Sequence, residues 1–131
     1  MVRKICLDTD ILINMMRNDS HTRGVIAAFD ADFYTTTVNV FELWQGHKKG
    51  KETMELLEPL IKIDFDEKSA FVAGDIQKKL FDKGDVLDFR DIFIGAMCIK
   101  NDMELLTFNV RHFERMKKFG LRMVYVKWEN S

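Results

Sequence analysis

Hydrophobic and polar positions follow two different periods along the chain, and the two periods alternate. Short apolar or β-branched runs are typical of strands, whereas apolar residues spaced three and four apart are typical of helices. The first pattern covers residues 2–7, 33–37, 61–65, 105–107 and 123–126, and the second covers residues 11–17, 24–29, 38–46, 51–57, 66–83, 88–101 and 110–119. Strands that alternate with helices favour a parallel sheet covered on both faces. We therefore expect an α/β fold, namely a three-layer α/β/α sandwich around a central, mainly parallel sheet.

Length and composition narrow the class of protein. The 131 residues are 47% hydrophobic and 31% charged, which suffices for one domain over residues 1–131 and excludes a disordered or low-complexity chain. The longest apolar runs, such as residues 92–99, are much shorter than a membrane span, and two acids stand where a signal peptide would be apolar. We expect a cytoplasmic protein without a membrane segment. Cys6 and Cys98 lie in apolar runs without metal-binding spacing, which predicts buried thiols.

The charge balance restricts how a nucleic acid could bind. The net charge is −1, so the field of the whole molecule does not attract a polyanion from a distance. Binding would depend on local basic groups, of which the sequence offers Lys48, Lys49 and Lys51 in one group and Arg111 in another. Charge clusters of this size are also typical of ordinary solvated surfaces.

Three acids occupy positions where a lone carboxylate is costly. Asp8 follows the first predicted strand, and binding sites of open parallel sheets lie beyond the carboxyl ends of their strands. Glu42 and Asp91 lie in predicted helices, and each has apolar neighbours on both sides. We expect Thr37 to cap the helix that contains Glu42. The structural alternatives are a helix cap for Asp8 and buried salt bridges for the other two. Glu42 would then pair with a lysine and Asp91 with a partner such as Arg3.

If these acids meet, they repel one another unless a cation lies between them. Carboxylate oxygens are the preferred ligands of Mg²⁺ and Mn²⁺. Such an ion can polarise a phosphoryl oxygen and activate a water molecule for attack on phosphorus. Hydrolysis of a phosphodiester is therefore the leading chemistry.

Four ordered motifs resemble a known family. They read DTDILI at residues 8–13, ELWQG at 42–46, DIFIGA at 91–96 and TFNVRHF at 107–113. In order and spacing they resemble the motifs of PIN-domain ribonucleases, over essentially the whole chain, and the length is most similar to that of the VapC toxins of prokaryotic toxin–antitoxin pairs. The resemblance implies an endoribonuclease that depends on Mg²⁺ or Mn²⁺. It also implies an RNA substrate, a cognate antitoxin and a homodimer.

The resemblance assigns roles to individual residues. Asp8, Glu42 and Asp91 match the catalytic and metal-binding acids of the family. Many members have a fourth acid where this chain has Asn109 and His112. Because neither side chain adds negative charge when neutral, the resemblance implies that a second metal ion binds more weakly here, with Asn109 as a further ligand. The supporting positions are Thr9, Thr107, His112 and Asp88, the last of which is also a candidate helix cap, and the candidate RNA-binding residues are Arg90, Lys48, Lys49, Lys51 and Arg111.

Two other functions compete with this one. Asp8 and Asp10 after a strand resemble the nucleophile loop of haloacid-dehalogenase-like phosphatases, although Leu12 stands where that loop has Thr or Val. A PIN-like module could also bind RNA or protein without cutting. A nuclease assay with and without Mg²⁺ distinguishes the cutting protein from the binding one.

Overall fold

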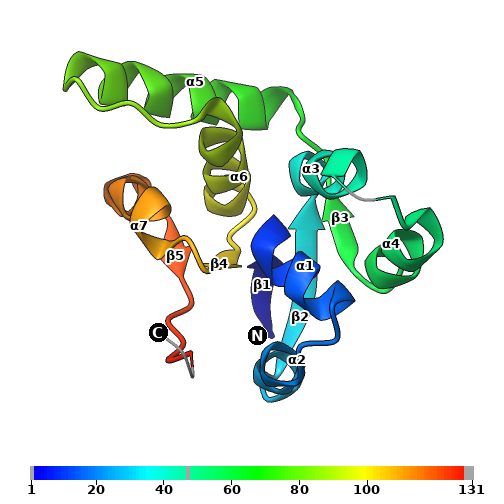
Figure 1. The fold of residues 1–131 in the computed structure, drawn as a ribbon. Coiled ribbons are helices and arrows are strands. Elements are labelled where there is room, and N and C mark those ends of the chain that lie inside the picture. The colour runs from blue at the N-terminus through cyan, green and yellow to red at the C-terminus, as the bar shows by residue number, and fades with distance from the viewer. Residues whose placement is uncertain (1, 47, 129–131) are drawn as a thin grey trace.

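The computed structural model describes residues 2–46 and 48–128 and confirms the predicted α/β class (Figure 1). The strands are β1 (Arg3–Leu7), β2 (Ala31–Thr36), β3 (Ile61–Ile63), β4 (Glu104–Leu106) and β5 (Arg122–Met123). The helices are α1 (Thr9–Met16), α2 (Ser20–Ala27), α3 (Thr37–Gly46), α4 (Gly50–Leu57), α5 (Glu67–Asp82), α6 (Phe89–Lys100), α7 (Val110–Phe113) and the 3₁₀ helix η1 (Glu114–Phe119). Within the two described ranges, no helix is both long and apolar enough to cross a membrane.

The strands form one parallel sheet in the order β3-β2-β1-β4-β5. β1 lies at its centre, where Cys6 is in register with Tyr34 of β2 and with Leu105 of β4. The carboxyl ends of β2, β1 and β4 consequently meet at one edge of the sheet. The residues that follow these strands in the sequence therefore come close together in space.

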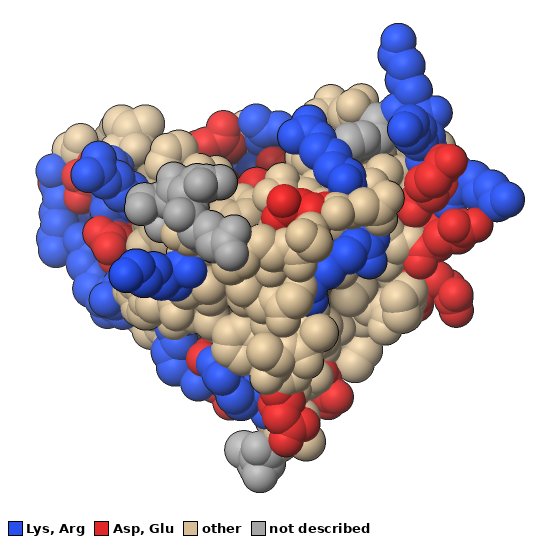
Figure 2. Space-filling model, turned by 60° about the horizontal axis from the view of Figure 1, so that its bottom comes forward, with Lys and Arg blue, Asp and Glu red and all other residues tan. Residues whose placement is uncertain are grey.

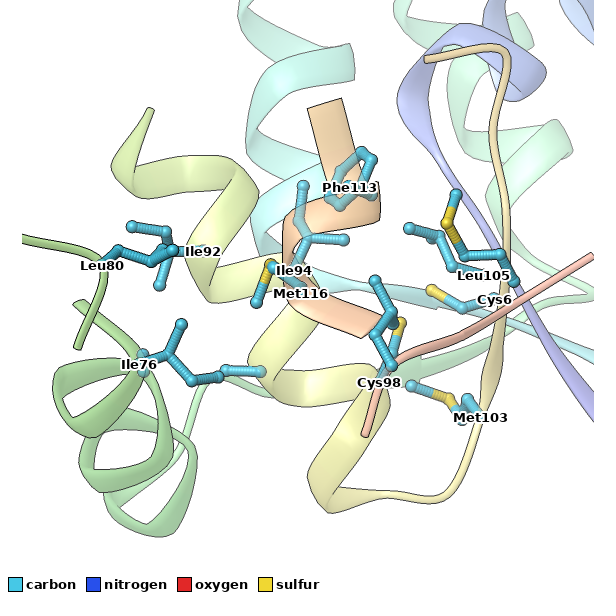
Figure 3. Packing of buried hydrophobic residues seen from close by; sticks show 14 residues of the cluster. Cys6, Ile76, Leu80, Ile92, Ile94, Cys98, Met103, Leu105, Phe113 and Met116 are labelled. Carbon is cyan, nitrogen blue, oxygen red and sulfur yellow. The ribbon is translucent and has the colours of Figure 1, made fainter. Parts of the chain in front are cut away.

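Both faces of the sheet are covered by separate apolar clusters. Ile5 and Leu7 of β1 pack with α1 and its neighbours, whereas Cys6, between them in the sequence, packs on the opposite face with α5 and α6. This alternation follows from the two-residue period of a strand. Cys6 and Cys98 are fully buried free thiols in the second cluster, as predicted (Figure 3).

Several predicted boundaries and one cap are wrong, for local reasons. α2 begins four residues earlier than predicted, because the Asp19 carboxylate accepts a hydrogen bond from the backbone N–H of Thr22. Thr36, not Thr37, caps α3: its hydroxyl accepts from the backbone N–H of Asn39 at 3.2 Å.

The carboxyl-terminal part of the chain also differs from the prediction. The helix predicted over residues 110–119 is divided into α7 and η1, which ends at Gly120 with a left-handed φ of 108°. The last strand is Arg122–Met123, rather than residues 123–126. It lies at the edge of the sheet, and its single neighbour β4 is itself short.

Candidate active site

The three predicted acids lie at the carboxyl edge of the sheet, each positioned by a different element. Asp8 follows β1 and caps α1, because its Oδ1 accepts from the backbone N–H of Thr9 at 2.9 Å. The residue is 6% exposed. Glu42 projects from the middle of α3 and Asp91 from the first turn of α6, with 19% and 23% of their side chains exposed. The helix-cap interpretation of Asp8 is thus correct, and it is compatible with a role in a site.

Hydrogen bonds connect Asp8 to Glu42. The amide nitrogen of Asn39 donates to Asp8 Oδ1 at 2.9 Å and to the hydroxyl of Thr9 at 3.0 Å. Thr9 in turn donates to Glu42 Oε1 at 2.8 Å. On the other side, the hydroxyl of Thr107 donates to Asp8 Oδ2 at 2.6 Å. Thr9 and Thr107, predicted as supporting residues, therefore contact the acids directly.

Burial makes it harder for all three acids to ionise, and repulsion by a neighbouring charge adds to this effect at Glu42 and Asp91. Burial raises the pKa of Asp8, although the hydrogen bonds from Thr107, Thr9 and Asn39 oppose this effect. Burial also raises the pKa of Glu42 and of Asp91, and the negative charge of Asp8 adds to the increase at both residues. A bound cation would relieve this repulsion.

The structure does not support the salt bridges considered as alternatives. Arg3 is bound to Glu104 through a 2.8 Å contact, so the structural alternative that pairs it with Asp91 is wrong. Asp91 instead faces Nδ1 of His112 at 3.6 Å. The cation near Glu42 is Arg90, not a lysine, and the two charged groups are 3.9 Å apart. Both contacts are too long for strong ion pairs.

A polar cavity of about 460 Å³ opens beside Glu42 and Asp91. Asn109 and His112, which occupy the position of the fourth acid, both line it. Asn109 follows β4, and its backbone N–H donates to the hydroxyl of Thr107 at 3.0 Å. The structure thus places these two residues beside the acids, as the spacing of the motif predicts.

Asp88 and the basic candidates occupy less central positions. Asp88 caps α6, since its carboxylate accepts from the backbone N–H of Arg90 at 2.9 Å, and this confirms the capping alternative. Arg90 lines the acid cavity. The remaining candidates are Lys48 and Lys49 just before α4, Lys51 within α4, 4.0 Å from Glu55, and Arg111 on α7. On the face drawn in Figure 2, Lys and Arg side chains are interspersed with Asp and Glu around an uncharged centre.

Two polar residues next to the acids were not predicted as part of the site. Asn39 is completely buried, and an amide within the apolar run VNVFELW could have indicated its role. Asp10 was considered only as the second acid of a phosphatase loop. Its Oδ2 accepts from the backbone N–H of Phe108 at 3.1 Å and from Thr107 at 3.3 Å. It thereby joins α1 to the segment after β4.

The donor atoms suit a divalent cation of the Mg²⁺ or Mn²⁺ type, because these ions prefer carboxylate oxygens. Asp8, Glu42 and Asp91 would supply those oxygens, and burial raises the pKa of all three carboxyl groups. Across residues 2–46 and 48–128, no group of three or more His, Cys, Asp or Glu side chains is already arranged as a metal site. Binding of one ion by all three acids would therefore require these side chains to move.

The all-parallel sheet, with a polar cavity beside Glu42 and Asp91, makes the protein a three-layer α/β domain with a candidate site at the carboxyl edge of the sheet. The sequence pattern of the PIN domain matches residues 5–119, so the chain belongs to the PIN domain family. Within that family it is VapC-like. It is 33% identical to Ribonuclease VapC3 of Methanocaldococcus jannaschii over 91 residues, which cover 70% of this chain and 94% of the relative.

Further comparisons agree with this assignment. Ribonuclease VapC1 of the same organism is 28% identical over 121 residues, covering 92% of this chain and 86% of the relative. VapBC2 from Rickettsia felis, solved with a DNA fragment from its promoter, has a chain with a TM-score of 0.78 and 23% identity, covering 95% of this chain and 99% of that one. A chain of VapBC-1 from nontypeable Haemophilus influenzae has a TM-score of 0.79 and 19% identity, covering 92% of this chain and 96% of that one. These two structures show that the fold is shared.

Proposed function

We propose that this protein is a metal-dependent endoribonuclease and the toxin of a VapBC-type toxin–antitoxin pair. The arrangement of Asp8, Glu42 and Asp91 carries the proposal. The three carboxylates lie at the same edge of the sheet, the charge of Asp8 raises the pKa of Glu42 and of Asp91, and none of the three has a short salt bridge to a described Lys or Arg. The similarity to ribonucleases named VapC3 and VapC1 supports RNA as the substrate.

The residues of the site would have different roles in this reaction. Asp8, Glu42 and Asp91 would hold Mg²⁺ or Mn²⁺, and Asn109, which lines the cavity with Glu42 and Asp91, would be a further oxygen ligand. When bound, the ion supplies a Lewis acid for the phosphoryl group and a more acidic water. The Thr9 and Thr107 hydroxyls orient the Glu42 and Asp8 carboxylates. Arg90 lies at the rim, where its guanidinium can contact a phosphate of the RNA.

A surface between α1 and α4 is available to the proposed antitoxin. A cavity of about 380 Å³ lies between α1 and α4, with an apolar floor that includes Met15, Met16 and Leu56. Glu52 and Glu55 line the same cavity. These features suit an amphipathic segment that carries basic side chains. A toxin–antitoxin complex from Klebsiella pneumoniae and VapBC-5 from Mycobacterium tuberculosis, a member of the VapBC family of toxin–antitoxin systems, share this fold, which supports such a partner.

We also propose a homodimer, one nuclease domain over residues 1–131 and a cytoplasmic location. An apolar groove of about 500 Å³ offers a surface for the dimer, and its lining includes Phe41, Phe65, Phe89 and Phe93. The exposed fraction is 58% for Phe41 and 61% for Phe89. Exposed aromatic groups clustered in this way are typical of protein interfaces.

A cleavage assay tests the proposed activity. We expect the parent protein to cut single-stranded RNA in Mg²⁺ or Mn²⁺ and not in EDTA. Asp8→Asn and Glu42→Gln keep the size of each side chain but remove a charge, and each should reduce cleavage at least ~100-fold, which corresponds to ~2.7 kcal/mol. Binding of RNA without any cleavage would instead favour the non-catalytic module. Hydrolysis of small phosphomonoesters would favour the phosphatase.

A further inference from the structure

Asn39 is fully buried in the first turn of α3, one helical turn before Glu42. It contacts neither the acid cavity nor solvent, yet its side chain touches Asp8 and Thr9. We propose that Asn39 is a positioning residue, which fixes the relative orientation of the Asp8 and Glu42 carboxylates through a one-directional hydrogen-bond relay. This inference rests on the proposed metal site and adds a requirement to it.

The neighbours of Asn39 determine which way its amide group points. The hydroxyl of Thr36 accepts from the backbone N–H of Asn39 at 3.2 Å and donates to Asn39 Oδ1 at 2.7 Å. The backbone N–H of Thr36 also points at Oδ1, at 3.4 Å. With two donors on the oxygen, the amide nitrogen must face the opposite side. There it meets Asp8 Oδ1, which can only accept when ionised.

The direction of the next hydrogen bond follows from proton counting. The Thr9 hydroxyl has one proton, and it already accepts a hydrogen bond from the amide nitrogen of Asn39 at 3.0 Å. Its proton therefore goes to Glu42 Oε1 at 2.8 Å. The relay runs from Thr36 through Asn39 and Thr9 and ends on Glu42, with a branch to Asp8.

The relay counteracts the repulsion between the two acids. Side chains of like charge repel one another, and the half-buried side chain of Glu42 is flexible enough to move away from Asp8. Two donors fixed by Asn39 hold one oxygen of each carboxylate. The other oxygen of Glu42, Oε2, lies outside the relay, and its described contact is the 3.9 Å approach of Arg90. The relay thus leaves Oε2 available to bind a cation.

The test measures Mn²⁺ affinity by titration calorimetry, in four proteins: parent, Asn39→Ala, Thr9→Val and the double variant. Hydrogen-bond partners of metal ligands typically contribute 10- to 100-fold to metal affinity. We expect each single variant to bind Mn²⁺ at least ~10-fold more weakly. Because both variants interrupt the same relay, the double variant should be no weaker than the weaker of the two singles.

Thr53→Val is the matched control. Thr53 is a fully buried threonine whose hydroxyl donates to the backbone carbonyl of Lys49, away from the acids. This variant should lose thermal stability yet keep the parent Mn²⁺ affinity. If Asn39→Ala does not fold, Thr36→Val replaces it, because it removes the donor that orients the amide. Thr36→Val must then also weaken Mn²⁺ binding.

The possible outcomes separate this inference from the proposed function. A parent that does not bind Mn²⁺ overturns both. A parent that binds Mn²⁺, together with Asn39 or Thr36 variants of unchanged affinity, overturns the relay and leaves the metal site intact. If the fold-losses of Mn²⁺ affinity in the two single variants multiply in the double variant, the relay is also overturned, because Asn39 and Thr9 then act independently.

Discussion

Asp10 provides a sharp test of the electrostatics around the acids. Burial and the nearby charge of Asp8 raise its pKa from 3.8 to about 7. Its Oδ1 is buried without a hydrogen-bond partner among the described residues. The perturbation is Asp10→Asn, which keeps the shape of the side chain and removes the ionisable group.

The sign and size of the effect follow from proton linkage. Between pH 3.8 and about 7 the folded parent binds more protons at Asp10 than the unfolded chain does, so its stability falls as the pH rises. Asp10→Asn lacks this dependence. The stability of the variant relative to the parent should therefore increase by about 2 to 3 kcal/mol between pH 5 and pH 8. Burying the amide costs about 1 to 3 kcal/mol, but this cost is the same at every pH and cancels in the comparison.

Urea unfolding followed by circular dichroism gives the required free energies of unfolding. Parent and variant are compared in EDTA, at equal protein concentration, from pH 5 to pH 8. Asp66→Asn serves as the control. The hydrogen bond from Lys100, at 2.6 Å, lowers the pKa of Asp66, so this residue is ionised in both states over the whole range. The free energy of unfolding of Asp66→Asn should therefore differ from that of the parent by the same amount at every pH.

Parallel stability curves for the parent and Asp10→Asn would refute the reasoning. They would mean that Asp10 ionises in the folded protein as easily as in the unfolded chain. If the stability of Asp10→Asn relative to the parent instead decreased as the pH rises, Asp10 would have a stabilising partner when charged. In either case the site would be less repulsive than the structure indicates.

Two further predictions concern association. Phe89→Asp places a charge in the apolar groove, so it should convert the proposed dimer to a monomer at tens of micromolar in sedimentation. A parent that is already monomeric would contradict this. The cognate antitoxin should insert a basic side chain among the acids, so excess Mn²⁺ should weaken its inhibition of cleavage. Inhibition that is independent of Mn²⁺, with Asp8, Glu42 and Asp91 uncovered in the complex, would exclude that mode.

The sequence predicts the edge of the sheet better than it predicts the interior of the site. Asp8 follows a short apolar strand, and the ends of neighbouring parallel strands must meet, so local pattern and topology together place it. Glu42 and Asp91 were found because a carboxylate among apolar neighbours requires an explanation. These inferences need short-range pattern and one rule of topology.

Contacts between distant segments were not predictable in this way. Asp10 is bound by the backbone of Phe108, nearly a hundred residues later, and nothing in its local sequence indicates that partner. Glu42 approaches Arg90 from a different helix, whereas the structural alternative paired it with a lysine. The orientation of Asn39 depends on Thr36, Asp8 and Thr9 at once. Side-chain direction, which fixes such contacts, is not encoded in hydrophobic periodicity.

The central claim is that the acids form a metal site and not a structural salt bridge. Thermal melting of the parent and Asp91→Asn, each in EDTA and in Mg²⁺, tests it most directly. Asp91→Asn removes a charge from a repelling group, so in EDTA it should melt no lower than the parent. Mg²⁺ should then raise the melting temperature of the parent more than that of the variant. A large loss of stability in EDTA and in Mg²⁺ alike, with RNA cleavage intact, would contradict the account, because it is the result expected when a buried ion pair loses one partner.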